Sequence, residues 1–452
     1  MRIIIIGGGK VGRTIAEQLN MEGHDIAVID SNIAVVESIV HNFDVLGVVG
    51  NGASYSVLTE AGIEEAEILI AVTDSDELNL LCCMIAKKRS NCSTIARVRN
   101  PTYNSEIGFI REELGLAMVI NPEYAAATEI ARILRFPSAI KIDTFARGKV
   151  ELLEFEIDEN SYLCDKSLIE VSSTMKSDVL VCAVERGDEV IIPKGRFVLK
   201  AKDKISIVAS PANFKKFFSK LGMDTHQVSD AMLVGGGKIA YYLAQQLINM
   251  GIEVKIIEKN QPRCEELSSL LPKAIIINGD GTDKDTLLEE DIDHCSAFVS
   301  LTGIDEANIF LSLFAKSRSN AKIITKVNRI SFDDIVENFN LGSIIYPKFI
   351  TAEYIVRYVR ALQNGIGSNV ETLYRIVNKK AEALEFKIQP GSPVIGIPLQ
   401  ALNIKDNILV ACINRKGKII IPNGQSVIAV GDTVVVIAVD KGLDDIKDIL
   451  KA

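Results

Sequence analysis

The amino-acid sequence predicts an α/β chain built as a tandem duplication, with a doubly wound parallel sheet followed by a small α+β domain in each half. Three observations lead to this prediction. The 452-residue chain repeats its own motifs at a spacing of 228 or 229 positions. Each half opens with an apolar strand and a glycine-rich turn, followed by alternating strands and amphipathic helices. Short strands separated by turns come later in each half and indicate a second, smaller domain.

The duplication rests on four matched segments that occur in the same order in both halves. Because four matches near one spacing are very improbable by chance, we expect the repeat to cover nearly the whole chain. The pairs are Ile3–Gly12 with Met232–Ala240, Val28–Asp30 with Ile256–Glu258, Val72–Asn79 with Leu301–Asn308, and Ile191–Gly195 with Ile420–Gly424.

The first part of each half is expected to form a parallel sheet, because buried strands alternate with helical segments there. In the first half the predicted strands are Arg2–Ile6, Asp25–Ile29, Val45–Val49, Ile68–Val72, Thr94–Val98 and Ala117–Ile120. The predicted helices are Val11–Met21, Ile33–His41, Ser54–Ala61, Glu77–Arg89 and Asn104–Leu114.

The small domains are expected to begin where this pattern stops, after Pro137 and again after Gly365. Predicted strands in the first of them are Val150–Ile157, Val179–Glu185 and Lys204–Ala209, with turns at Arg186-Gly187-Asp188 and Pro193-Lys194-Gly195. Four domains follow, namely 1–138, 139–226, 227–364 and 365–452.

The first glycine-rich turn, Gly7-Gly8-Gly9-Lys10-Val11-Gly12, fits the Rossmann fingerprint G-x-G-x-x-G. It follows an apolar strand, opens a helix and precedes an acid, Asp30, by 18 residues from its last glycine. Gly7 would permit the tight turn, Gly9 the close approach of a phosphate, and Gly12 the packing of helix on strand. The helix N-terminus would offer free N–H groups to that phosphate. The turn therefore predicts a mononucleotide or dinucleotide site.

Asp30 is expected at the end of the second strand, where it would accept hydrogen bonds from an adenosine ribose. A carboxylate there repels a 2′-phosphate, so NAD or an adenine nucleotide is favoured over NADP. The alternative is that Asp30 caps a helix or belongs to a turn.

Two further strand ends carry polar residues. Thr73 and Asp74 end the fourth strand, where doubly wound sheets place ligand contacts, although Asp74, Ser75 or Asp76 could instead cap the next helix. Arg97 and Arg99 end the fifth strand, where an arginine could bind a pyrophosphate. A surface salt bridge is the alternative for these arginines.

The second copy differs in detail. The third glycine becomes Ala240 and the acid becomes Glu258, and the fingerprint tolerates both changes. Lys326 replaces Arg97 and Asn328 replaces Arg99, which weakens a bidentate phosphate clamp. We expect this copy to bind nucleotide with a different affinity or to bind a different ligand. A degenerate structural copy is the alternative.

Composition excludes several classes of protein. The net charge of −9 disfavours nucleic acid as a partner. Eight cysteines without a C-x-x-C pair indicate reduced cytosolic thiols, and four histidines show no metal-ligand spacing. The N-terminus lacks a signal peptide and no stretch reaches about 18 apolar residues, so we expect a soluble chain or one bound to a membrane through a partner.

No catalytic constellation is visible, so two nucleotide units favour a sensor over an enzyme. An NAD-dependent oxidoreductase with duplicated Rossmann units is the alternative.

The motifs together resemble those of the RCK or KTN family, whose members regulate potassium channels and transporters. The resemblance covers essentially the whole chain, and the duplication matches the Trk type within this family. It rests on the glycine turn, Asp30, Gly50–Ser54, Thr73–Asn79 and Ala96–Pro101, which recur in order in the second half, including Gly279–Thr282.

Such a resemblance implies a non-enzymatic regulatory subunit on the cytoplasmic face of the cell membrane. It would form a homo-oligomeric ring, such as a tetramer, beneath a membrane-embedded potassium-translocating subunit. NAD(H), or alternatively ATP/ADP, would bind the clefts and shift the ring between conformations through a difference in affinity.

The fingerprint and the resemblance give one set of candidate nucleotide contacts in each copy. They are Gly7, Gly8, Gly9, Lys10, Val11, Gly12, Asp30, Asn51, Thr73, Asp74 and Arg97 in the first, and Gly235, Gly236, Gly237, Lys238, Ile239, Glu258, Asp280, Thr302, Gly303 and Lys326 in the second. Asn51 lies where relatives often have an aspartate, at the adenine edge. Glu123 lies in a segment where some relatives place a cation. Because its counterpart is Lys348, a salt bridge or surface position is favoured over a metal site.

Overall fold

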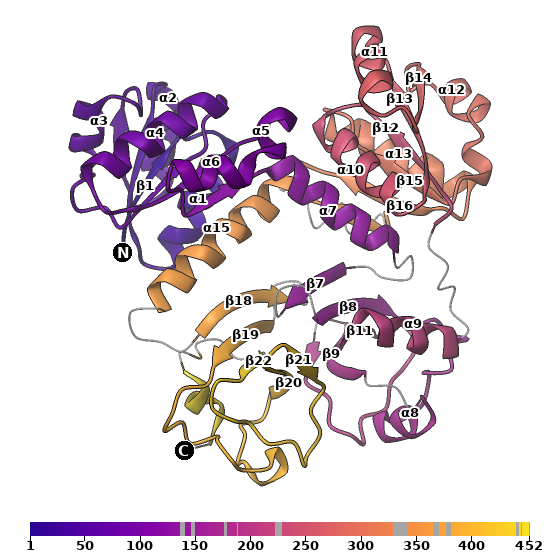
Figure 1. Ribbon diagram of the computed structural model, residues 1–452. Coiled ribbons are helices and arrows are strands. Elements are labelled where there is room, and N and C mark those ends of the chain that lie inside the picture. The colour runs from indigo at the N-terminus through magenta and orange to yellow at the C-terminus, as the bar shows by residue number, and fades with distance from the viewer. Residues whose placement is uncertain are drawn as a thin grey trace. The chain divides into compact units, whose positions relative to one another are not determined.

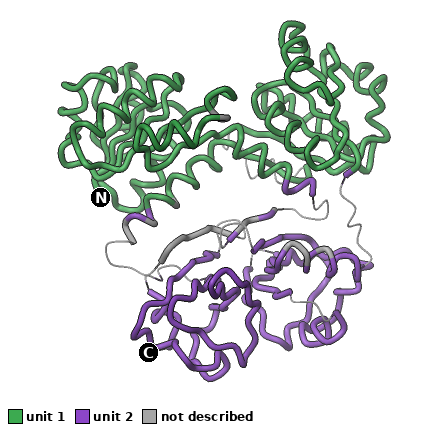
Figure 2. Tube along the Cα trace, viewed as in Figure 1, with its two compact units in different colours: residues 1–131, 229–359 green, residues 132–228, 360–452 purple. Residues whose placement is uncertain are grey.

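The computed structural model describes the whole chain except residues 136–140, 146–149, 176–178, 188, 222–227, 329–340, 365–369, 377–380, 440–442, 444 and 452. The described residues form two compact units (Figure 2). One unit contains Met1–Ala131 and Ser229–Val359, and the other contains Arg132–Val228 and Arg360–Ala452. Each unit therefore combines corresponding parts of the two repeats: the large domains share the first unit and the small domains share the second.

The first large domain contains a six-stranded parallel sheet in the order β3-β2-β1-β4-β5-β6 (Figure 1). The predicted doubly wound sheet is thus confirmed. The order reverses between β1 and β4, the place where such sheets bind ligands. The strands are β1 (Arg2–Ile6), β2 (Asp25–Asp30), β3 (Leu46–Val49), β4 (Ile68–Ala71), β5 (Ser93–Arg97) and β6 (Met118–Ile120).

Helices follow the strands of this sheet, with two differences from the expected pattern. The segment predicted as one helix over Asn104–Leu114 forms two helices, because Asn100 caps and Pro101 begins the first of them. A further helix, not predicted, begins at Pro122. The helices are α1 (Lys10–Met21), α2 (Ile33–Asn42), α3 (Tyr55–Glu60), α4 (Asp76–Arg89), α5 (Pro101–Ser105), α6 (Ile107–Glu113) and α7 (Pro122–Arg135).

The second large domain repeats this sheet in the order β14-β13-β12-β15-β16-β17, again parallel. Its strands are β12 (Asp230–Val234), β13 (Glu253–Glu258), β14 (Ile275–Asn278), β15 (Ala297–Ser300), β16 (Lys322–Lys326) and β17 (Ser343–Ile345). Its helices are α10 (Lys238–Asn249), α11 (Gln261–Leu270), α12 (Lys284–Glu289), the 3-10 turn η2 (Ile292–His294), α13 (Asp305–Arg318) and α15 (Pro347–Asn364).

The small domains each contain a five-stranded antiparallel sheet, in the orders β10-β9-β11-β8-β7 and β18-β19-β22-β20-β21. The first consists of β7 (Lys141–Phe145), β8 (Val150–Glu156), α8 (Leu168–Met175), β9 (Leu180–Arg186), β10 (Glu189–Ile191), β11 (Lys204–Ala209) and α9 (Pro211–Lys220). The second consists of β18 (Val370–Ile376), β19 (Ala381–Lys387), η3 (Leu399–Ala401), β20 (Ile408–Arg415), β21 (Lys418–Ile420), β22 (Thr433–Ala438) and η4 (Ile446–Ile449).

Burial explains why the strands of the large domains read as continuous apolar runs. Ile3 to Ile6 of β1 are all at most 2% exposed, as expected for a central parallel strand covered on both faces. In the other unit, one apolar cluster joins both small domains and includes Leu152, Cys182, Ala383 and Cys412. The predicted boundaries near 138 and 226 fall outside the described residues, as does residue 365 at the third, so these boundaries stay predictions.

Candidate nucleotide-binding sites

The first glycine turn leaves the carboxyl end of β1 and is closely packed at two of its three fingerprint glycines. Gly7 has a φ of +98°, and a Cβ there would lie 2.9 Å from the backbone nitrogen of Thr73. At Gly12 a Cβ would lie 1.8 Å from the carbonyl oxygen of Gly7. At Gly9, by contrast, a Cβ would meet nothing within 4 Å. The turn is therefore open at the glycine where the fingerprint expects the phosphate.

Asp30 holds this turn in place. Its Oδ2 accepts a hydrogen bond from the backbone N–H of Gly8 (2.7 Å), and its Oδ1 accepts one from Asn32 (2.9 Å). The turn role considered for Asp30 is thus present in the structure. A carboxylate oxygen can accept more than one hydrogen bond, so these contacts leave room for a ribose hydroxyl. The ribose contact stays a prediction.

The second copy reproduces the arrangement. Glu258 accepts hydrogen bonds from the backbone N–H groups of Gly236 (2.7 Å) and Asn260 (2.8 Å). Gly235 has a φ of +105°, and the space around a Cβ at Gly237 is empty to 4 Å. The longer side chain of glutamate therefore serves the same turn as aspartate does.

A buried asparagine joins the ends of β4 and β5 in the first copy. Asn79 accepts hydrogen bonds from the N–H (2.8 Å) and hydroxyl (2.7 Å) of Thr73 and donates to the carbonyl oxygen of Arg97 (2.9 Å). In the second copy Asn308 makes the same bonds to Thr302 and Lys326. Neither asparagine was predicted from the sequence as a site residue, although both recur in the matched segments Val72–Asn79 and Leu301–Asn308.

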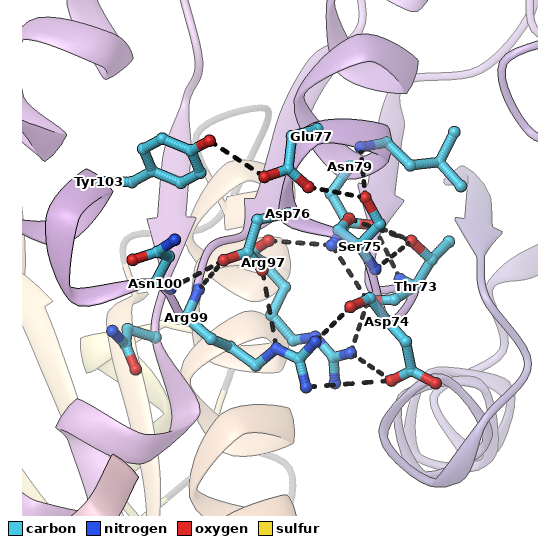
Figure 3. Close-up of polar contacts among 12 residues, drawn as sticks. Thr73, Asp74, Ser75, Asp76, Glu77, Asn79, Arg97, Arg99, Asn100 and Tyr103 are labelled. Atoms are coloured by element: carbon cyan, nitrogen blue, oxygen red, sulfur yellow. Dashed lines mark hydrogen bonds and ion pairs between the residues drawn. The ribbon is translucent and has the colours of Figure 1, made fainter. Parts of the chain in front are cut away.

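Arg97 points across the end of the sheet toward Asp74 (Figure 3). Its Nη2 donates to the carbonyl oxygen of Thr73 (2.5 Å) and to Oδ1 of Asp74 (3.0 Å). The Arg97 side chain is 8% exposed and that of Asp74 is 100% exposed, so the salt bridge considered from the sequence is present, with its arginine buried and its carboxylate at the surface. Burial lowers the pKa of Arg97 from its ordinary value, yet a guanidinium stays charged in proteins. Arg97 is therefore a fixed positive charge at the strand end.

The residues after Asp74 shape the start of α4. Ser75 caps the helix by accepting a hydrogen bond from the N–H of Leu78 (3.1 Å). Asp76 turns back and accepts from the backbone N–H groups of Arg99 and Asn100, each at 2.8 Å. The capping alternative is thus confirmed for Ser75, while Asp74 itself bonds to Arg97.

At the matching place in the second copy, Gly303 takes the position of Asp74 and Lys326 that of Arg97. Nζ of Lys326 donates to the carbonyl oxygen of Leu301 (3.1 Å). Burial lowers the pKa of Lys326 from its ordinary value. The second copy therefore presents a single ammonium where the first presents a planar guanidinium, and the two are not interchangeable toward phosphate.

The two large domains contact each other beside these strand ends. The Tyr242 hydroxyl on α10 accepts from Nδ2 of Asn121 (3.0 Å) and donates to the carbonyl oxygen of Arg99 (3.2 Å). The rings of Tyr124 and Tyr242 meet edge to face at 5.5 Å. Helix α10, which begins at the second glycine turn, is thereby tied to the end of β5 in the first copy.

A pocket of about 300 Å³ lies between the two large domains. It brings together residues of both copies, and four of them are basic. The lining residues include Val11, Arg97 and Glu123 from the first repeat and Gly237, Lys238, Ile239, Lys326 and Lys348 from the second. Asn51 and Asp280 do not line this pocket; both lie exposed after β3 and β14.

Glu123 is the single acid among these lining residues. Its Oε2 is buried and has no hydrogen-bond partner among the described residues. Burial raises the pKa of Glu123 above its ordinary value. The expected salt bridge is not found among the described residues, and Glu123 is partly buried rather than fully exposed. The sequence could not show that a second-repeat surface would cover this residue.

Among the described residues, no helix combines the length and the apolar character that crossing a membrane requires. In the same part of the chain, no group of three or more histidine, cysteine, aspartate or glutamate side chains is arranged to hold a metal ion.

Comparison with protein families places a domain type on each part of the chain. The TrkA-N domain matches residues 3–122 and 231–347, and the TrkA-C domain matches residues 152–222 and 383–451. The chain is 32% identical to Trk system potassium uptake protein TrkA homolog 1 of Methanosarcina mazei over the whole of both chains. It is also 32% identical to Trk system potassium uptake protein TrkA of Halomonas elongata, over 98% of this chain and 96% of the relative.

Solved structures share the fold. The GsuK RCK domain matches with a TM-score of 0.64 at 16% identity, covering 97% of this chain and 92% of that one. The GsuK channel bound to NAD matches with the same score and identity, covering 97% of this chain and 76% of that one.

Proposed function

The chain belongs to the TrkA family of Trk system potassium uptake proteins, and on this basis we propose that it is a nucleotide-sensing regulatory subunit of a potassium uptake transporter. The family name supports the transport role. The paired glycine turns, each held by its own acid, support the nucleotide sensing.

NAD(H), or alternatively ATP/ADP, is the proposed ligand of both turns. The open space at Gly9 and Gly237 fits phosphates, which the N-termini of α1 and α10 would bind through free N–H groups. Asp30 and Glu258 would hold the ribose hydroxyls. Residues at the ends of the fourth and fifth strands would line the other side of each ligand. They are Thr73, Asp74 and Arg97 in the first copy, and Thr302, Gly303 and Lys326 in the second.

The observation that carries the proposal is the pocket shared by the two copies. It contains Arg97 of one copy and Lys238 and Lys326 of the other, so a negatively charged ligand in either site acts on residues of both domains. A ligand that binds one arrangement of the domains more tightly than another shifts the population between them. This is the physical requirement for a regulatory switch.

The proposed partner is a membrane-embedded potassium-translocating subunit, beneath which copies of this chain assemble as a homo-oligomeric ring, such as a tetramer. The proposed location is the cytoplasmic face of the cell membrane. Four domains with boundaries at 1–138, 139–226, 227–364 and 365–452 are part of the same proposal.

Potassium uptake tests this function directly. Uptake is measured in cells that contain the partner transporter, with and without this chain, and again with Gly9→Asp and Gly237→Asp variants. We expect uptake to depend on the chain and its nucleotide dependence to change in the variants. Unchanged uptake without the chain would overturn the proposal. Robust turnover of NADH with a panel of carbonyl substrates would instead favour the duplicated oxidoreductase.

A further inference from the structure

The pocket between the two large domains is lined by equivalent residues of both copies. They form four pairs, namely Val11 with Ile239, Arg97 with Lys326, Pro122 with Pro347, and Glu123 with Lys348. One pocket can contain both members of a pair only where equivalent surfaces of the two copies face each other. The pocket therefore belongs to the contact between the copies, and neither large domain forms it alone.

The side chains that line this pocket carry a net positive charge. The basic ones are Arg97, Lys238, Lys326 and Lys348. Asp74, at the surface, offsets the charge of Arg97. Lys326 donates a hydrogen bond to the carbonyl oxygen of Leu301 (3.1 Å), and a neutral carbonyl group does not cancel the charge of an ammonium group. Because Glu123 is the single lining acid, the pocket should attract anions.

Helix N-termini add to this charge. The starts of α1, α7, α10 and α15 all contribute lining residues, which are Val11, Pro122, Lys238 and Pro347. The N-terminal end of a helix carries partial positive charge. An anion in this pocket would therefore lie close to several such ends.

Two polar groups at the pocket lack hydrogen-bond partners within the described chain. One is the Nε–H of Arg97, whose side chain is more than nine-tenths buried. The other is Oε2 of Glu123. Burial raises the pKa of Glu123, and the positive charges of Arg99, Lys238 and Arg97 act against this rise. The pocket thus has an unused donor and an unused acceptor, and an occupant that both accepts and donates hydrogen bonds would satisfy both.

We propose that this pocket binds inorganic phosphate as the hydrogen phosphate dianion, and that Glu123 selects phosphate over sulfate. Hydrogen phosphate has three oxygens that accept hydrogen bonds from lysine and arginine, and one P–OH group that donates to the Glu123 carboxylate. Sulfate has the same charge and tetrahedral shape but no proton at neutral pH, so that carboxylate repels it. The inference goes beyond nucleotide sensing, because it requires no nucleotide in either glycine turn.

Size and protonation favour free phosphate over the end of a bound nucleotide. A water molecule takes about 30 Å³ of liquid, so a pocket of about 300 Å³ holds a tetrahedral oxyanion together with several waters. A phosphate monoester loses its last proton with a pKa of about 6. At pH 8 the terminal phosphate of a nucleotide therefore has no P–OH group for Glu123, whereas free hydrogen phosphate keeps one.

Calorimetry on the full chain, freed of nucleotide, tests the site. Sodium phosphate and sodium sulfate are titrated at pH 8 and constant ionic strength. We expect phosphate to bind at least about tenfold more tightly than sulfate, because a charge-assisted hydrogen bond takes the place of a repulsion. The melting temperature should also rise more with phosphate than with sulfate. Absence of phosphate binding, or equal binding of the two anions, would overturn the inference.

Glu123→Gln tests the selectivity. The carboxamide has the same shape as the carboxylate, but it carries no charge and offers an NH2 donor. Sulfate should then bind as tightly as phosphate, within about threefold. A preference for phosphate that persists in this variant would overturn the role given to Glu123.

Lys348→Glu tests the location. It places an acid at both members of one matched pair and should weaken phosphate binding at least about 100-fold. Lys273→Glu is the matched control, because it makes the same change of charge in the exposed turn between α11 and β14. An equal loss in both variants would overturn the location. Where thermal melting shows that Lys348→Glu is unfolded, Lys238→Gln replaces it and should weaken phosphate binding about tenfold.

Titration of the same chain with NAD and ATP separates this inference from the proposed function. If ATP binds but phosphate alone does not, the phosphate site is overturned and the proposed function stands. If phosphate binds selectively but neither nucleotide binds, the proposed function fails and the phosphate site stands.

Discussion

Gly9→Asp and Gly237→Asp offer the sharpest test of the two glycine turns. Each glycine is the N-cap of its helix, with φ and ψ near −61° and −172° for Gly9 and −68° and −174° for Gly237. Any residue adopts this extended conformation, and a Cβ at either position meets nothing within 4 Å. Aspartate is also a preferred N-cap, better than glycine by a few tenths of a kcal/mol. Both variants should therefore fold with unchanged or slightly raised stability.

The effect on binding follows from charge. A carboxylate about 4 Å from a phosphate costs about 1 kcal/mol in water and about 4 kcal/mol at an effective dielectric constant of 20. Both glycines are exposed and begin a helix at the end of the first strand of their sheet, so a value between these limits, about 2–3 kcal/mol, is expected. This corresponds to binding weaker by about 30- to 160-fold.

Calorimetric titration with NADH, ATP and ADP measures the loss. Gly9→Asp should weaken one of two binding events by this factor and Gly237→Asp the other, while thermal melting without ligand stays at or slightly above the wild-type value. Gly108→Asp is the matched control, because Gly108 is also exposed and has open space at its Cβ but lies on α6. Wild-type affinity in both turn variants would refute the assignment of phosphate to these turns.

Three further predictions concern stability. Because burial raises the pKa of Glu123, the stability that this group contributes is present below its ordinary pKa and is lost as the pH rises through the raised value. The Glu123→Gln variant should therefore have a melting temperature about 1–3 °C above that of the wild type at pH 7–8, and the difference should vanish near pH 4. A difference that stays constant across this pH range would contradict a raised pKa of Glu123 as its cause. Asn79→Ala leaves the N–H of Thr73 and the carbonyl oxygen of Arg97 without their hydrogen-bond partner. It should therefore lower the free energy of unfolding, measured in denaturant, by about 2–3 kcal/mol. A loss below about 0.5 kcal/mol would show that the hydrogen bonds of Asn79 are dispensable. Tyr242→Phe removes the hydroxyl that lies between Asn121 and Arg99, and it should lower the free energy of unfolding by about 1–2 kcal/mol. Tyr241→Phe should lower it by less, because the Tyr241 hydroxyl only accepts a hydrogen bond from Gln245 on the same helix.

The sheets and the glycine turns could be predicted because their signals are local. A central parallel strand is apolar throughout, and β1 runs over Arg2–Ile6 as expected. Glycine at Gly12 follows from a backbone contact within one strand-turn-helix unit, because a Cβ there would lie 1.8 Å from the carbonyl oxygen of Gly7. The apolar runs and the glycine spacing can be recognised in a single sequence because residues close together in the chain create them.

Contacts between distant segments could not be predicted in the same way. The hydroxyl of Tyr242 meets Asn121 across 121 positions, and no periodicity marks either residue. Glu123 is a similar case, since its burial depends on residues of the second repeat that line the same pocket. Asn79 and Asn308 did carry a signal, because they end matched segments of the two repeats.

The junction between Asn121 and Tyr242 also bears on how such a protein can evolve. In a symmetric dimer of identical half-length chains, a gene encodes each surface once and every substitution changes both sides. Here the tyrosine that precedes Pro347, Tyr346, stands in the second repeat where Asn121 stands in the first, and Thr14 stands where Tyr242 does. Covalent fusion has thus freed the two sides to drift apart, and selection can act on one nucleotide site of the pair without altering the other.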